Sequence, residues 1–303
     1  MTGLDTAAAA AGFTLPGQAS PDDDAAIQAL VARPAFPGAL RHMLDSFLRL
    51  QDGYLINKLN ADEGRHFVSI FALALHAEHR AGRSPSGLTL ARLKRACAPL
   101  GLMGHGRMEA TLGLLRQARL LVEAPPGPDR RVRRLEPSEA LVAQFQARIG
   151  FHLEALEMLF PGRAHLARLR DDPRFFWDLS WLRAQTISTE PSLQSRLPAL
   201  AGAAQTEGGY VILCALLRGL GDAPGLPPPG VVALPYAEHS ERFGLSRTQM
   251  RRVVTRLAEH GLVRPVEPGG QAIEVLPLAI GTMAQLGAIR LLRFDRYAVA
   301  ARG

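Results

Sequence analysis

The sequence predicts a mainly helical protein with small β-hairpins. It is organised as tandem helix-turn-helix units, each followed by a hairpin, that are joined by a helical scaffold. Three observations lead to this prediction. The stretch Pro235–Leu276 reads as helix, glycine turn, amphipathic helix and two short strands. Residues 103–122 repeat the pattern of residues 245–264. Helical segments follow both hairpins, from Ser138 to Phe160 and from Leu276 to Arg296.

The amphipathic helix after Ser246 carries the clearest functional signal. Its apolar residues fall at i, i+3, i+4 and i+7, as Met250, Val253, Val254 and Leu257. The hydroxyl of Ser246 can cap this helix. At 100° per residue the polar residues lie on the opposite face, and they are Arg247, Thr248, Gln249, Arg251, Arg252, Thr255 and Arg256.

These residue types suit a DNA groove. Arginine pairs with guanine, glutamine with adenine, and threonine with a phosphate or a thymine methyl. We therefore expect Ser246 and the polar face of this helix to contact duplex DNA, together with Arg264 at the base of the hairpin. The competing interpretation is an ordinary surface helix with solvated arginines.

The flanking segments favour the DNA interpretation. Tyr236–Phe243 reads as a short helix, Gly244 permits a tight turn, and Pro268-Gly269-Gly270 separates two short strands. A helix-turn-helix followed directly by a hairpin is a winged helix. This segment resembles the DNA-binding core of MarR-type bacterial transcriptional regulators.

The internal repeat extends this resemblance to most of the chain. A shift of 142 positions aligns Met108 with Met250, Leu112 with Val254 and Leu115 with Leu257. MarR-type proteins are usually homodimers of subunits about half this length, so the resemblance implies a covalent pseudo-dimer. It leaves open whether the chain acts as a monomeric pseudo-dimer or as a homodimer. We divide the chain into a disordered segment at 1–33, with a helix compatible with Ala25–Val31, a first repeat at 34–160 and a second at 161–303.

The two repeats differ where they would meet DNA. At the outward positions of the first helix, Gly106, Ala110 and Gly113 replace larger polar residues. The polar candidates that remain are His105, Arg107 and Arg116. The first hairpin is the more basic, with Arg130, Arg131, Arg133 and Arg134. We expect the second repeat to read bases and the first to grip phosphates. Alternatively, the first helix docks on another protein.

Charge and composition fit a cytoplasmic DNA-binding protein. The net charge is +7, and the four acids but single base of residues 1–33 leave 34 bases against 24 acids in the remainder. Cys97 and Cys214 are expected to be buried, reduced thiols. We see neither a secretory signal nor an apolar run long enough for a membrane span.

Evidence for an enzyme, a metal or a cofactor is weak. His66, His76 and His79 share one segment without a defined carboxylate partner, and Phe175, Phe176, Trp177 and Trp181 suit core packing. The resemblance leaves room for a small-molecule effector between the scaffold helices and the DNA-binding units. Two further interpretations keep the fold: a plasmid-type replication initiator with two winged helices, and a winged-helix protein-interaction module.

Overall fold

The computed structural model describes residues 24–51, 63–101, 103–125, 132–189, 196–267 and 271–301, and most of them are helical. The helices are α2 (Asp24–Val31), α3 (Phe36–Arg49), α5 (Glu63–Arg80), α6 (Leu90–Cys97), the 3-10 turn η1 (Ala98–Leu100), α7 (His105–Gln117), α8 (Glu139–Leu159), α9 (His165–Asp171), α10 (Phe175–Thr189), α12 (Pro198–Gln205), α13 (Gly209–Gly219), α14 (Tyr236–Phe243), α15 (Arg247–Glu259) and α16 (Pro277–Ala300). The strands are β1 (Leu121–Glu123), β2 (Leu135–Pro137), β3 (Gly230–Ala233), β4 (Val263–Pro265) and β5 (Ala272–Val275).

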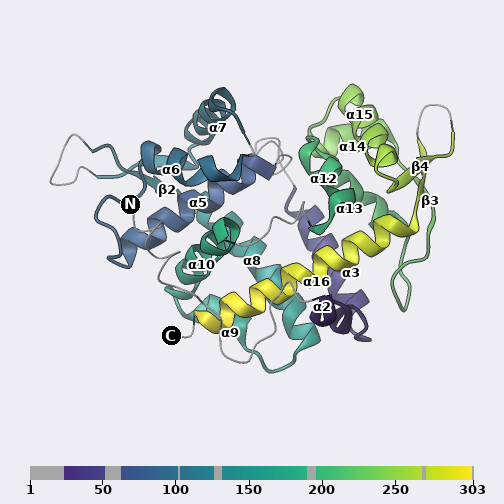
Figure 1. Cartoon of the computed structure of the whole chain (residues 1–303), viewed down its shortest axis with the longest axis horizontal. Coiled ribbons are helices and arrows are strands. Elements are labelled where there is room, and N and C mark those ends of the chain that lie inside the picture. The colour runs from purple at the N-terminus through teal and green to yellow at the C-terminus, as the bar shows by residue number, and fades with distance from the viewer. Residues whose placement is uncertain are drawn as a thin grey trace.

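Two lobes stand on a shared helical base (Figure 1). Lobe 1 contains α5, α6, α7, β1 and β2, and lobe 2 contains α12 to α15 with β3, β4 and β5. The base contains α2, α3, α8, α9, α10 and α16, and α16 runs along it beneath both lobes. A mainly helical protein with small antiparallel sheets, as the sequence predicts, is confirmed.

In lobe 2, helices α14 and α15 are followed by the predicted hairpin of β4 and β5. A third strand, which the sequence did not predict, completes this sheet in the order β3-β5-β4. It runs antiparallel to β5, with Gly230 opposite Val275. The short Gly-Val-Val-Ala run follows a proline-rich stretch, where its strand pattern is too brief to stand out.

Lobe 1 has the same order of elements with a smaller sheet. Strands β1 and β2 pair antiparallel, and a single bridge between Leu88 and Leu135 lies where lobe 2 has a full third strand. Helices α7 and α15 each contain 13 residues and begin 142 positions apart, at His105 and Arg247. The constant shift does not extend to α8 and α16, because the hairpin of lobe 2 is shorter.

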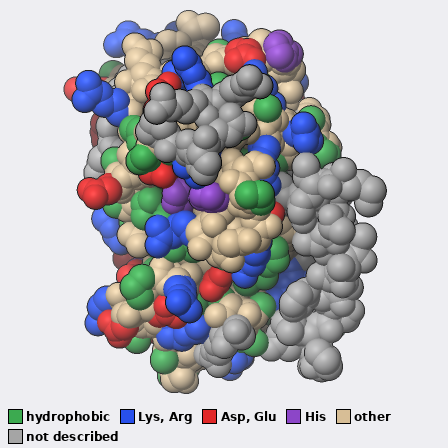
Figure 2. Space-filling view, turned by 90° about the vertical axis from the view of Figure 1, so that its left-hand side faces the viewer, with side chains coloured by type: hydrophobic (Ala, Val, Ile, Leu, Met, Phe, Trp, Pro, Cys, Tyr) green, Lys and Arg blue, Asp and Glu red, His purple; other side chains and the backbone are tan. Residues whose placement is uncertain are grey.

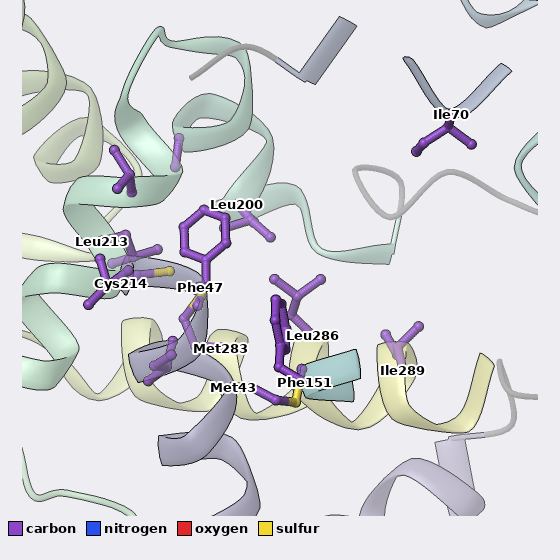
Figure 3. Close-up of a cluster of buried hydrophobic side chains, with 14 of the residues drawn as sticks. Met43, Phe47, Ile70, Phe151, Leu200, Leu213, Cys214, Met283, Leu286 and Ile289 are labelled. Carbon is purple, nitrogen blue, oxygen red and sulfur yellow. The ribbon is translucent and has the colours of Figure 1, made fainter. Parts of the chain in front are cut away.

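The base helices are exchanged between the two sequence halves. From residues 34–160, α3 packs against α13 of lobe 2, and from residues 161–303, α10 packs against α5 of lobe 1. In the same way α2 packs on α16 and α9 on α8. The shared core is visible in Figure 3, where Phe47 of α3 lies near Leu213 of α13, and Phe151 of α8 lies near Leu286 of α16. The two spans therefore interlock and do not form separate compact domains.

The described part of the N-terminal segment begins with a helix at Asp24. Helix α2 buries Ile27 and Leu30 in the base and matches the short helix expected at Ala25–Val31. The disorder expected for the rest of the segment falls on residues 1–23, which lie outside the described part. Cys97 and Cys214 are buried free thiols, and burial raises the pKa of each to about 12. Such thiols stay protonated and unreactive. Among the described helices, none has the length and apolar character required to cross a membrane.

Candidate nucleic-acid interface

Helix α15 begins with a well-defined cap. The Ser246 hydroxyl accepts a hydrogen bond from the Gln249 amide nitrogen at 3.1 Å, and the Gln249 side-chain oxygen accepts one from the Ser246 amide nitrogen at 2.8 Å. These reciprocal bonds form a capping box, which satisfies two otherwise unpaired N–H groups at the helix start. Gly244 turns the chain in front of it with a left-handed φ of 63°. The capping box and the Gly244 turn together define where α15 begins and how it leaves the turn.

The two faces of α15 are separated as the sequence predicts. The buried face packs into lobe 2 through Met250, Val253, Val254 and Leu257. The exposed residues are Arg247, Thr248, Arg251, Arg252, Thr255 and Arg256. An exposed row of arginine and threonine on a rigid helix can donate to base edges and phosphates.

The exposed arginines of α15 are not equally available. Arg247, Arg251 and Arg252 form no ion pair within the part of the chain that the structure describes. Arg256 is paired with Glu259 at 2.8 Å. Arg264 at the base of the hairpin is paired with Glu274. The strongest candidates for DNA contact are therefore the first three.

Gln249 has a structural role that the sequence interpretation missed. Its side-chain oxygen belongs to the capping box, and its side-chain nitrogen donates to Glu207 at 3.1 Å. Both ends of the amide are thus occupied, so Gln249 is poorly placed to read adenine. The Ser-x-x-Gln spacing is itself the sequence signature of a capping box and could have indicated this role.

Helix α7 of lobe 1 presents a smooth surface. Met108, Leu112 and Leu115 are buried, whereas the outward positions are exposed and occupied by Gly106, Ala110 and Gly113. Around the two glycines there is open space where a side chain would extend. The exposed polar candidates at the start of the helix are His105 and Arg107. This face offers few donors to a base edge.

The four hairpin arginines of lobe 1 differ in exposure and in whether the structure describes them. Arg130 and Arg131 lie outside the described residues, Arg133 is exposed, and Arg134 is half-buried. Arg134 turns toward the lobe, where its guanidinium lies 2.9 Å from Nε2 of His79 and 3.3 Å from the Pro125 carbonyl oxygen. Of the pair described, Arg133 is the one placed to reach a phosphate.

Helices α7 and α15 lie on the same side of the molecule, each at the end of its lobe farthest from α16 (Figure 1). The residues that these two helices expose form the candidate interface. On the adjoining side, which Figure 2 shows facing the viewer, Lys and Arg side chains alternate with Asp and Glu. That side does not form a single basic area. The case for α15 therefore depends on the regular spacing of its exposed arginines and not on a high local density of positive charge.

The three histidines of α5 do not converge. His66 stacks on Phe145 with ring centroids 5.4 Å apart, His76 lies beside Trp177, and His79 binds the Ser84 carbonyl and Arg134. Within the described residues no group of three metal-ligating side chains comes together. The aromatic run of α10 is used in packing: Phe175 and Phe176 are buried, and Trp177 and Trp181 lie under Arg80 and Arg83.

Comparison of the chain with protein-family models, with curated proteins and with solved structures gave no match. The resemblance to MarR-type regulators therefore stays a prediction, and the functional argument depends on the geometry of the lobes.

Proposed function

We propose that this chain is a sequence-specific duplex-DNA-binding protein that regulates transcription, with α14 and α15 as a helix-turn-helix and the β4–β5 hairpin as its wing. The observation that carries the proposal is the capped helix α15, which buries four aliphatic side chains and exposes Arg247, Arg251 and Arg252 without ion-pair partners among the described residues. An α-helix with such a face has the size and the donors to enter a major groove.

The arrangement of the lobes supports binding by a single chain. Lobes 1 and 2 are held on one interlocked base, with α7 and α15 on the same side. The same molecule therefore holds a second lobe with the same order of elements, as a dimer of smaller subunits would. Since α7 and α15 differ so strongly in their exposed residues, one chain should occupy one asymmetric site.

The experiment is selection of bound fragments from random duplex DNA by the full chain, followed by affinity measurement on the selected site and on random DNA. A regulator should enrich one site, bound by one chain in analytical ultracentrifugation. A replication initiator should instead enrich short direct repeats. Absence of any enrichment and of any salt-dependent affinity would overturn the proposal.

A protein-interaction role is the second candidate, and one observation favours it. The outward positions Gly106, Ala110 and Gly113 of α7 are exposed and carry no side chain larger than a methyl group, with open space around both glycines. Such a face allows close approach of another backbone. If the chain shows no DNA affinity, this role replaces the first.

A further inference from the structure

A group of basic side chains lies inside the molecule, where the base meets both lobes. It consists of His66 of α5, Arg148 and His152 of α8, Arg183 of α10 and Arg290 of α16, which we call the central basic cluster. The contributing helices come from both halves of the chain. None of its members lies on α15, and the cluster has no part in the proposed DNA contact.

Arg148 is the most enclosed arginine of the cluster. Only 7% of the residue is exposed, and its guanidinium lies over the Phe47 ring at 5.4 Å. Its Nε and Nη2 atoms are shielded from solvent and have no hydrogen-bond partner among the residues that the structure describes. These two N–H groups lie on the same edge of the guanidinium, the edge that binds two oxygens of a carboxylate or phosphate side by side.

His66 contributes a third donor. Arg183 donates from Nη2 toward the His66 Nε2 atom, at 3.1 Å, so the proton of the neutral ring resides on Nδ1. That Nδ1 atom is also buried, and the described part of the chain offers it no hydrogen-bond partner. His66 stacks on Phe145, which lies one helical turn before Arg148 on α8, so both side chains occupy the same side of that helix.

The neighbouring charges are all positive. Arg290 donates to the Tyr210 hydroxyl, and none of Arg148, Arg183 and Arg290 is paired with a carboxylate among the described residues. Burial, followed by the charges of Arg183 and Arg290, lowers the pKa of Arg148 to about 9. Burial also lowers the pKa of Arg183 to about 10, and holds the pKa values of His66 and His152 well below their ordinary range.

Burying several cations without a counter-charge is strongly unfavourable, and a buried polar atom without a partner commonly indicates a bound ion or water. The three orphan atoms are all donors, so water, which both donates and accepts, would satisfy them without neutralising the charge. An acceptor-only ligand with negative charge satisfies both requirements.

We propose that the central basic cluster binds one small oxyanion per chain, a carboxylate or a phosphate. Two of its oxygens accept hydrogen bonds from Nε and Nη2 of Arg148, and the Nδ1 proton of His66 is donated to the same anion. Arg183 and Arg290 contribute charge. Because the anion joins helices of both halves, its binding stabilises the interlocked base. This inference does not depend on DNA binding.

The test is thermal unfolding and titration calorimetry of the full chain, freed of oxyanions by dialysis into a chloride buffer. Inorganic phosphate and sodium acetate are added separately, with sodium chloride at the same ionic strength as reference. We expect saturable stabilisation by at least one probe, with one anion bound per chain. The preferred probe distinguishes a phosphate from a carboxylate ligand. Failure of both probes to exceed chloride would overturn the proposal.

Variants assign the effect to the cluster. Arg148→Met should abolish the response and, in chloride alone, unfold at a temperature no lower than the parent, because an unpaired buried charge has been removed. Arg168→Met is the matched control: its guanidinium lies over Phe175 and donates to the Ala298 and Ala301 carbonyls, so this variant should keep the response. An unchanged response in Arg148→Met would overturn the site.

If Arg148→Met does not fold, a second variant carries the comparison. His66→Phe keeps a ring against Phe145 but removes the Nδ1 donor, and it should weaken anion binding about tenfold, the loss expected for one hydrogen bond to a charged group. Unchanged affinity in this variant would contradict the proposed contact.

Discussion

The Arg134 guanidinium donates to the Nε2 atom of His79 at 2.9 Å, while Nδ1 of the same ring lies 2.9 Å from the Ser84 carbonyl oxygen. A carbonyl can only accept, so Nδ1 carries the proton and Nε2 is free to accept from arginine. The hairpin of lobe 1 is thus fastened to α5 by its own arginine. Its neighbour Arg133 stays exposed.

This relationship predicts different effects for two adjacent arginines. If lobe 1 touches DNA, Arg133→Ala should flatten the plot of log affinity against log salt by about 0.9, the loss of one phosphate contact, and weaken all sequences alike. Arg134→Ala should leave the slope unchanged and lower the unfolding temperature, because it releases the hairpin. A salt series on random duplex DNA measures both. An unchanged slope in Arg133→Ala would mean that this arginine does not contact DNA.

The sequence predicted the helix α15 almost residue by residue, for a physical reason. Capping and 3.6-residue periodicity are local signals, and both are strong here. Ser246 caps the helix and Met250, Val253, Val254 and Leu257 are buried, as expected. The pattern on α7 is equally local, so its buried and smooth faces were also predictable.

What the sequence could not predict are contacts between distant segments. Periodicity shows that α3 has an apolar face, but not that this face packs on α13 of the other half. The contact of Arg134 with His79 depends on the distance between a hairpin and a helix, and Gln249 reaches Glu207 only in the folded lobe. The central basic cluster is assembled from four helices, each of which contributes one or two residues.

A second prediction separates reading of bases from support of the helix. Arg251→Ala and Arg252→Ala should each reduce the preference for the selected site over random DNA, by about 1–3 kcal/mol if each makes a bidentate base contact. Gln249→Ala should leave that preference intact and lower the free energy of unfolding by about 1 kcal/mol, through loss of the capping box. Competition binding and denaturant unfolding provide the two measurements. Equal loss of preference in all three variants would mean that Gln249 also contacts bases.

A third prediction concerns acid. Burial beside Trp177, followed by the nearby charge of Arg80, lowers the pKa of His76 from 6.5 to about 4. Protonation therefore favours the unfolded chain, so the stability that neutral His76 contributes is complete above pH 6.5, decreases below it, and is lost at about pH 4. His66 and His152 shift in the same direction. His76→Gln should make the fall of unfolding temperature between pH 6.5 and pH 4 less steep without abolishing it. A profile identical to the parent would show that His76 is not desolvated.

The last prediction tests whether the glycines on the smooth face of α7 lower the stability of the protein. Gly113 lies within the helix, is exposed, and has open space where a Cβ would extend. Alanine there should raise the free energy of unfolding by about 0.5–1 kcal/mol, because glycine loses more backbone freedom on helix formation. The contrasting change is Gly209→Ala in α13, where a Cβ would collide with the Ala203 backbone carbonyl, so this variant should be strongly destabilised. Denaturant unfolding compares the two. If Gly113→Ala is no more stable than the parent, the open space at Gly113 does not by itself determine the effect of adding a methyl group there. If it is more stable and still binds DNA as the parent does, the glycine is not required for DNA contact, and close approach of a protein partner becomes the better explanation of the smooth face.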